Sequence, residues 1–312
     1  MRDLRSFVKA LEERQELVRV KKAVDTKFEI GTLARKSEIQ GGPALLFEKP
    51  AGYTIPVVVD IISTVDRLAL GIGASKEQLV DKIATAMENP LKPISTKNSP
   101  FKERVFEKNI DLMEVLPVPV HSEMDGGPFI SGGVVFSKDP RSGRQNLSFH
   151  RMHVKGPTKL GIDIDPWRHL REFFENAGGN PLDIAVCIGL PPAVEIGAAA
   201  RVPYDEIEMA GALIGEPIEM VKCDHVNIEV PACTEIVIEG SILPIMEKEG
   251  PFAEFTGYYG GETHPVFEVK AISCRTDAIY RTICGGSMEH VSLGNVVTRD
   301  PLLYRFVRHV SS

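Results

Sequence analysis

The chain has 312 residues, of which 43% are hydrophobic and 25% are charged, and its formal net charge is −7. This composition is typical of an ordinary globular protein long enough for two domains, and it does not indicate disorder. Because the chain is acidic and has no basic run, we expect no nucleic-acid partner. The longest apolar stretches, such as IPVVVDII, are too short to span a bilayer, and the N-terminus lacks the apolar centre of a secretory signal, so we expect a cytoplasmic protein.

Five cysteines occur in the chain, and none of them forms a CxxC pair. Most lie in apolar, strand-like segments, which favours buried free thiols in a cytosolic protein and does not indicate a zinc site. They are Cys187, Cys223, Cys233, Cys274 and Cys284.

The N-terminal part alternates helical and strand patterns. A charged amphipathic helix is predicted at the start, followed by strands at ELVRVKKAV, GGPALLFEK and IPVVVDIIS. Helices are predicted at KFEIGTLARKSEIQ and at SKEQLVDKIATAMENP. We therefore expect an N-terminal α/β domain over residues 1–95 and a proline-containing linker over 96–115.

Beyond the linker, short β-rich runs with Gly and Pro turns predict a barrel or a sandwich. The segment FISGGVVFSKDPRSGRQNLSFHRMHV is a predicted hairpin, and helical inserts are expected near PWRHLREFFENAG and YDEIEMAGALIG. The predicted fold class is therefore α+β, with a strand-rich domain over 116–298. An apolar-faced helix is predicted over 299–312, with Asp300 and Pro301 at its start.

Several nucleotide and hydrolase motifs are absent from the sequence. LGIGAS and GYYGGE are neither a P-loop nor a complete GxGxxG, and turns explain both better. No GxSxG or HExxH occurs, so a serine hydrolase or a zincin has no support.

Two segments carry candidate chemistry. EKEGPFAEFTGYYGGETH places Glu249 and Glu254 around the turn at Gly250, which is either a solvated loop or a rigid site. In QNLSFHRMHV, Arg151 lies in a strand that should be half buried, so it needs an anionic partner, either a structural carboxylate or a substrate carboxylate. An offset of five residues puts Asn146 and Arg151 on opposite faces of a straight strand, so a shared site requires a turn or a bulge.

Other polar residues are scattered along the chain. His150 and His153 accompany Arg151, His169 lies in DPWRHLREF and Glu206 lies in RVPYDEIEMAG. The oxygen and nitrogen donors of Asn, His and Glu suit a hard or borderline ion such as Mn²⁺ or Mg²⁺. By default, however, each is a surface or capping residue, and spacing alone does not assemble them.

Taken together and in order, six segments resemble the UbiD family of reversible decarboxylases, which use prenylated FMN. They are NLSFHR, PWRH, DEIEMAGAL, EMVKC…VNIEVPACTEIVIEG, EGPFAEFTGYYG and HPVFEVKAISCRTDAIYRTI. The resemblance covers essentially the whole chain, and FHRMHVKG and SMEHVSLGN are most similar to the branch that acts on hydroxylated aromatic acids. It implies a flavin-binding split β-barrel over 116–298. Family members continue into a C-terminal domain, which we expect to be absent because this sequence ends within the helix at 299–312.

The resemblance also implies roles for single residues. The family's catalytic arginine and two glutamates fall on Arg151, Glu249 and Glu254, and the candidate for contact with a substrate hydroxyl is His290. The implied ligands of Mn²⁺ or Mg²⁺, with K⁺ as a further ion, are Asn146, His169 and Glu206. The implied flavin-binding set consists of Asn146, Phe149, His150, Arg151, Arg168, His169 and Glu206.

The implied activity is the reversible, non-oxidative decarboxylation of an aromatic or α,β-unsaturated acid. It proceeds through a covalent adduct between substrate and flavin, loss of CO₂ and protonation by Glu254, while Glu249 stays ionised beside Arg151. The implied partners are the acid and CO₂, a flavin prenyltransferase as cofactor supplier, and further copies of the chain in a homo-oligomer. Two alternatives stay open: a non-catalytic flavin-binding accessory subunit and a flavin reductase-like oxidoreductase.

Overall fold

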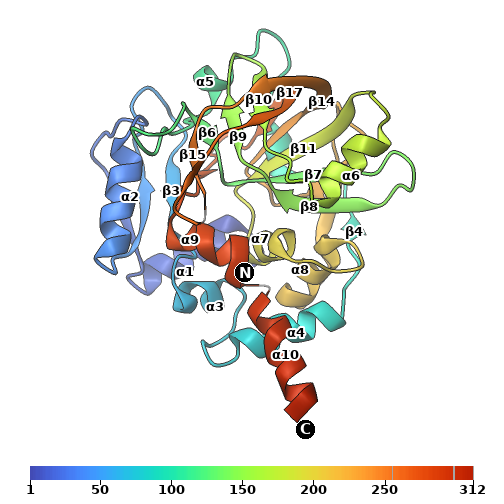
Figure 1. Cartoon of the computed structure of the whole chain (residues 1–312). Coiled ribbons are helices and arrows are strands. Elements are labelled where there is room, and N and C mark those ends of the chain that lie inside the picture. Colours follow the sequence, from blue (N-terminus) through green and yellow to red (C-terminus); the bar gives the residue numbers. More distant parts are fainter. Residues whose placement is uncertain (255, 298, 312) are drawn as a thin grey trace.

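The computed structural model of the chain describes residues 1–254, 256–297 and 299–311. Its helices and strands form a mixed α+β fold, as predicted (Figure 1). None of the helices in these ranges combines the length and apolar character needed to cross a bilayer. The helices are α1 (Leu4–Glu13), α2 (Glu29–Ile39), α3 (Val65–Gly71), α4 (Leu79–Glu88), α5 (Leu112–Val115), α6 (His169–Asn176), α7 (Pro192–Ala199), α8 (Glu206–Ile214), α9 (Met288–Val291) and α10 (Arg299–Ser311), with a 3₁₀ turn η1 (Pro100–Glu103) and a π-helical turn η2 (Ser292–Val296).

A four-stranded sheet in the order β1-β2-β3-β18 joins the two ends of the sequence. Alternate residues of β2 face opposite sides: Phe47 packs in one core with Ile30 of α2, and Leu46 packs in the other with Phe7 of α1. The last strand comes from much later in the chain and runs parallel to β3. The strands are β1 (Leu17–Val20), β2 (Ala44–Phe47), β3 (Val57–Val59) and β18 (Tyr280–Arg281).

A nine-stranded antiparallel sheet forms the larger part of the molecule, in the order β6-β9-β10-β17-β14-β11-β7-β8, with β5 also paired to β17. Its two longest strands carry a bulge at Gly240, where a Cβ would lie 2.1 Å from Glu268 O, so this position requires glycine. The strands are β5 (Arg104–Phe106), β6 (Phe129–Ile130), β7 (Gly133–Lys138), β8 (Gln145–Phe149), β9 (Met152–Val154), β10 (Lys159–Ile162), β11 (Leu182–Ile188), β14 (Ile236–Lys248) and β17 (Thr263–Cys274).

The nine-stranded sheet curls, because strands near its two ends are almost continuous in sequence. β8 ends at Phe149 and β9 begins at Met152, although β8 is the last strand at one end and β9 is next to β6 at the other. Three residues of extended chain span at most about 11 Å. The two ends of the sheet therefore approach each other, and only His150 and Arg151 lie in the crossing.

Two small sheets and a helical layer complete the fold. β12 (Glu219–Lys222) lies between β13 (Glu229–Pro231) and β4 (Ile94–Ser95), and β15 (Phe252–Ala253) pairs with β16 (Tyr259–Gly260). Helices α7 and α8 cover β7, β8 and β11, and this layer is visible in Figure 1. Its shared core contains Phe136, Leu147, Ala185, Val194, Ala198, Ile207 and Ala210.

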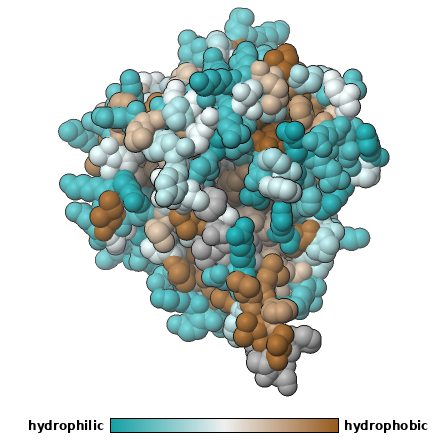
Figure 2. All heavy atoms as spheres, viewed as in Figure 1, coloured by the Kyte–Doolittle hydropathy of each residue, from teal (hydrophilic) through white to brown (hydrophobic). Residues whose placement is uncertain are grey.

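Most elements agree with the sequence predictions, including the hairpin β7–β8, in which Lys138 is paired with Gln145. Helices α3, α5, α7 and α9 were missed. Seven of the eight residues of α7 are buried, so it has no polar face and no helical period to detect. Helix α10 begins at Arg299, and its apolar residues Leu302, Leu303 and Phe306 form an exposed brown patch in Figure 2. All five cysteines are free, and four of them are buried, as predicted.

A buried ion cluster ties β18 to two helices near the cavity described below. Arg281 is fully buried, and its Nη2 lies 2.7 Å from Glu289 Oε1 of α9, while its Nε lies 3.4 Å from Glu195 Oε1 of α7. The side chains of Arg281, Glu289 and Glu195 are shielded from water, so their mutual attraction must compensate for the hydration that they lose on folding.

Replacement of Arg281 by Leu should therefore destabilise the fold by about 3–5 kcal/mol, because two buried carboxylates would lose their cation. Urea or thermal unfolding would measure the loss. Arg171→Leu is the control, since Arg171 pairs with the exposed Glu175 one turn along α6 and this ion pair should contribute at most about 1 kcal/mol. Equal losses in the two variants would contradict the prediction.

Candidate active site

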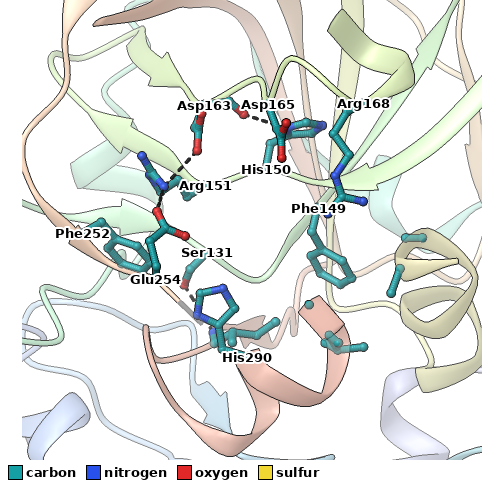
Figure 3. A pocket seen from close by; sticks show the side chains of 15 residues that line it. Ser131, Phe149, His150, Arg151, Asp163, Asp165, Arg168, Phe252, Glu254 and His290 are labelled. Carbon is teal, nitrogen blue, oxygen red and sulfur yellow. Dashed lines mark hydrogen bonds and ion pairs between the residues drawn. The ribbon is translucent and has the colours of Figure 1, made fainter. Parts of the chain in front are cut away.

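Arg151 lies in the crossing between β8 and β9, where its guanidinium is shared among three carboxyl groups, two of which, Asp163 and Glu254, are drawn in Figure 3. Its Nε and Nη2 donate to Glu249 Oε2 at 3.0 and 2.7 Å. Its Nη1 lies 2.9 Å from Asp163 Oδ2 and also donates to Glu254 Oε1. The Arg151 side chain is only 12% exposed, so these carboxyl groups, rather than water, balance its charge.

Strand order explains why these groups meet. β9, β10, β17 and β14 are neighbours and alternate in direction, so β10 and β14 end at the edge where β9 and β17 begin. Arg151 precedes β9, Asp163 follows β10, His264 is the second residue of β17 and Glu249 follows β14. Four neighbouring strands each contribute one titratable group to the same edge.

Glu249 is buried at the turn that contains Gly250 and Pro251. A Cβ on Gly250 would lie 2.7 Å from Gly126 Cα, so glycine is needed for this close approach. Burial alone would raise the pKa of Glu249, but the hydrogen bonds and charges of His264 and Arg151 outweigh it and hold this pKa below its ordinary value. Glu249 is therefore an ionised partner of Arg151.

Glu254 follows β15 and faces a cavity on another side of Arg151 (Figure 3). Its side chain is 31% exposed, whereas that of Glu249 is 0% exposed. His290 of α9 lines the same cavity, and burial together with the charge of Arg151 lowers its pKa to about 4, so the ring is neutral. Gly286 N donates to His290 Nδ1 at 3.2 Å, which places the ring proton on Nε2.

A hydrogen-bond chain runs along β8 toward Arg151. Asn146 Nδ2 donates to Ser148 Oγ at 3.0 Å, Ser148 Oγ lies 2.9 Å from His150 Nε2, and His150 Nδ1 lies 2.6 Å from Asp163 O. Burial lowers the pKa of His150 to about 4, so its ring is neutral, and Nδ1 donates to the carbonyl while Nε2 accepts from the hydroxyl. The chain thus ends at Asp163, the residue whose carboxylate binds Arg151.

Asn146, His169 and Glu206 come together at the other end of this hydrogen-bond chain. His169 Nδ1 lies 3.0 Å from Asn146 Oδ1 and 3.8 Å from Glu206 Oε1, and burial raises the pKa of Glu206 to about 7. Within the described ranges, no group of three His, Cys, Asp or Glu residues forms a metal-binding cluster, so the set depends on the amide of Asn146. One amide oxygen, one imidazole nitrogen and one carboxylate oxygen gathered in one place are donors that suit a hard or borderline divalent cation, so the three residues fit such an ion.

Arg168 and Phe149 line the wall of the cavity, as Figure 3 shows. Burial and the nearby charge of Arg201 act to lower the pKa of the Arg168 guanidinium, against the opposing effect of Asp165. We found no hydrogen bond from this guanidinium to a carboxylate in the part of the chain that the structure describes. A half-buried cation of this kind is suited to an external anion such as a phosphate.

The structure therefore assembles the predicted site residues, although their roles stay predictions. His153 is separate from them: its Nδ1 accepts from Gly250 N at 3.2 Å, and its ring stacks on Phe129. Sequence reasoning missed Asp163 and His264, and it did not predict β10, the strand that Asp163 follows. It also missed the cavity-lining residues Ser131, Asp165, Ala198, Ala199, Phe252, Ile283, Leu293 and Gly294.

Fold and site together define a mixed α+β protein with a cavity, lined by two arginines and three carboxyl groups, at one edge of a large antiparallel sheet. The sequence matches the N-terminal domain of 3-octaprenyl-4-hydroxybenzoate carboxy-lyase over residues 8–87 and the Rift-related domain of the same family over residues 92–288. The chain belongs to the UbiD family.

Solved structures agree with this assignment. A dimeric form, obtained by evolution, of the UbiD-class enzyme HmfF from Pelotomaculum thermopropionicum, in complex with prenylated FMN, is 42% identical and superposes with a TM-score of 0.95 over 99% of this chain and 73% of that one. The vanillic acid decarboxylase of Sedimentibacter hydroxybenzoicus is 31% identical, with a TM-score of 0.92 over 97% and 68%. The 3,4-dihydroxybenzoic acid decarboxylase of Klebsiella pneumoniae is 31% identical, with a TM-score of 0.90 over 95% and 68%.

The neutral state of His150 predicts a pH-dependent contribution to stability. Its pKa is about 4 in the folded chain and about 6.5 when unfolded, so the unfolded state takes up the proton first as the pH falls. The stabilising contribution is complete above pH 6.5 and is lost toward pH 4, by at most about 1.4 kcal/mol per pH unit. The difference in unfolding free energy between the parent and His150→Gln should therefore shrink from pH 7 to pH 5 in urea titrations. A difference that does not change with pH would contradict this.

Proposed function

We propose that this chain is a prenylated-FMN-dependent carboxy-lyase that removes CO₂ reversibly from a hydroxylated aromatic acid without net oxidation. The observation that carries the proposal is Arg151, held between buried, ionised Glu249 and cavity-facing Glu254. The relatives support the cofactor and the substrate class: one contains prenylated FMN, and vanillic and 3,4-dihydroxybenzoic acids are both hydroxylated aromatic acids. They support an aromatic acid more directly than an α,β-unsaturated one.

We also propose a domain division into an N-terminal α/β domain over 1–95, a linker over 96–115 and a flavin-binding split β-barrel over 116–298. The short crossing from β8 to β9 supports a sheet that nearly closes on itself. No pairing between β8 and β6 was found in the described residues, which agrees with an open, split form. Strand β5 lies within the proposed linker and pairs with β17, so the linker packs against the barrel.

In this proposal, Arg168 would bind the flavin phosphate, and Asn146, His169 and Glu206 would hold Mn²⁺ or Mg²⁺. K⁺ is proposed as a further ion without assigned ligands. When bound, prenylated FMN supplies the electron sink for the pair of electrons that the departing CO₂ leaves behind. Phe149 and His150 border the cavity in which the ring system would lie.

The residues of the chain orient the substrate and move the proton. Glu249 orients the guanidinium of Arg151. The part of the guanidinium that contacts Glu254 faces the cavity, where a substrate carboxylate can bind. This carboxylate adds a negative charge beside Glu254, which favours the protonated form of Glu254. Once CO₂ has left, Glu254 donates this proton to the carbon that carried the carboxyl group.

His290 can select the hydroxyl group of the substrate. Its ring is neutral, accepts from Gly286 N through Nδ1 and carries its proton on Nε2, so it can donate to an oxygen on the substrate ring. We further propose that a flavin prenyltransferase supplies the cofactor and that the protein is a cytoplasmic homo-oligomer.

Replacement of Glu254 by Gln in the flavin-loaded protein should lower kcat by roughly 10²–10⁴-fold, because the amide cannot donate the transferable proton. Release of CO₂ from vanillic or 3,4-dihydroxybenzoic acid would measure it. Glu208→Gln on α8 is the control and should keep parental turnover. Parental turnover in Glu254→Gln would overturn the proton-donor role. Full cofactor binding in the parent with no CO₂ release from any aromatic acid would instead favour the accessory-subunit alternative.

Removal of the metal carboxylate should abolish cofactor retention. Native mass spectrometry of the chain, co-expressed with a flavin prenyltransferase and purified without oxygen in Mn²⁺, should give a mass increment of prenylated FMN plus metal. The increment should disappear in Glu206→Ala and in Arg168→Ala and persist in Glu208→Ala, its matched neighbour on α8. Retention of both metal and flavin in Glu206→Ala would place the metal elsewhere.

A further inference from the structure

His264 lies between two of the carboxylates that bind Arg151. Its Nδ1 is 3.3 Å from Asp163 Oδ1, and its Nε2 is 3.3 Å from Glu249 Oε2. The side chain is 11% exposed, so little water reaches it. Among the described residues, these two carboxylates are the charged groups in contact with the ring, one after β10 and one after β14, and both also contact Arg151, which precedes β9. Arg151, Asp163, His264 and Glu249 thus contact one another in a closed ring, in which each basic side chain lies between two carboxylates. We call these four residues the charge ring.

The charge ring places the imidazole of His264 between two anionic groups. A neutral imidazole has one N–H and one nitrogen lone pair, so one of its nitrogens would direct a lone pair at a carboxylate oxygen. Both contacts lie at ion-pair distance, and Nε2 makes no well-aligned hydrogen bond to the described residues, so the attraction of both carboxylates is to the charge that an imidazolium would carry. Transfer of the proton from His264 to Glu249 would be unfavourable, because the charge of Arg151 favours the ionised form of Glu249.

Nearby histidines make the contrast clear. His150 meets a hydroxyl and a carbonyl oxygen, and His121 Nε2 lies 2.9 Å from Thr282 Oγ1. A hydroxyl can either donate or accept, so a neutral imidazole satisfies both sites. Burial lowers the pKa of each of these two rings to about 4. His264 differs because carboxylates face both of its nitrogens.

We propose that His264 is a positioning residue held as an imidazolium between Asp163 and Glu249, and that it completes a neutral charge ring which leaves Glu254 as the only carboxyl group at Arg151 free to exchange a proton. The ring then contains two cations, Arg151 and His264, and two anions, Asp163 and Glu249. Without the His264 charge, Arg151 would face three carboxyl groups alone. A proton could then settle on Glu249, and Arg151 would lose the anchor that directs it.

The protonation of His264 can be measured without flavin, substrate or turnover, although its role in proton transfer rests on the proposed function. In the full chain labelled with ¹⁵N on its eight histidines, both His264 nitrogens should have imidazolium-type shifts at pH 7. His264→Gln identifies the signals by their loss. In Asp163→Asn, the midpoint of the His264 titration should move at least about one pH unit lower, because one anion is gone. The signals of His225, which lies 3.5 Å from Glu107 on the surface, should not move. One protonated and one unprotonated nitrogen at pH 7 would overturn the proposal.

The pH dependence of kcat provides a second measurement. In His264→Gln, the net charge of the ring changes from zero to −1, which favours the protonated form of Glu254, so the alkaline limb of the kcat profile should move about one pH unit higher. His264→Lys should move it back toward the parental position. A loss of kcat that is equal at every pH, with no shift of the limb, would indicate a structural role only and overturn the positioning role. If the parent shows no turnover but the ¹⁵N signals are those of an imidazolium, the proposed function fails and the protonation of His264 stands.

Discussion

The chain has only two residues, His150 and Arg151, in which to pass from β8 at one end of the nine-stranded sheet to β9 near the other. This constraint curls the sheet, and it places a cation at the seam where the two ends approach. A charged side chain in an ordinary strand would point either to solvent or into an apolar core. In the crossing, the guanidinium instead meets the edge at which β10 and β14 end and β17 begins, and the groups from those strands neutralise it.

The same crossing resolves a conflict that the sequence contains. Asn146 and Arg151 are five residues apart and would face opposite sides of a continuous strand. Because β8 ends at Phe149, the two residues need not share one strand geometry, and a hydrogen-bond chain through Ser148 and His150 connects them to a common partner, Asp163. The candidate metal set and the charge ring are therefore two ends of one polar network. A shift at either end would be transmitted through neutral His150, whose two hydrogen bonds fix the orientation of its ring.

How far the sequence predicts this site depends on the range of the contacts. Glu249 and Glu254 could be singled out because they flank a constrained turn at Gly250 and Pro251, and the resemblance to the UbiD family then implied their roles. His264 and Asp163 could not, because they are 101 residues apart and meet only through the antiparallel register of β10 with β17, which no local pattern contains. Helix α7 escaped detection for a related reason: burial on nearly all sides is decided by what packs around it, and it removes the periodicity that would identify the helix.

The charge ring is a poor way to stabilise a fold. Burying two carboxylates with their cations costs hydration, and apolar residues of similar volume in such positions are often neutral or stabilising. Its advantage is geometric. Arg151 has five N–H donors in a fixed plane, and contacts on several sides define that plane before a substrate arrives, so little reorganisation is left for the reaction itself. Of the three carboxyl groups around the guanidinium, the least buried, Glu254, faces the cavity, whereas the fully buried Glu249 faces the protein. In the proposed function, that difference in burial separates Glu249, which orients the cation, from Glu254, which exchanges a proton with the ligand.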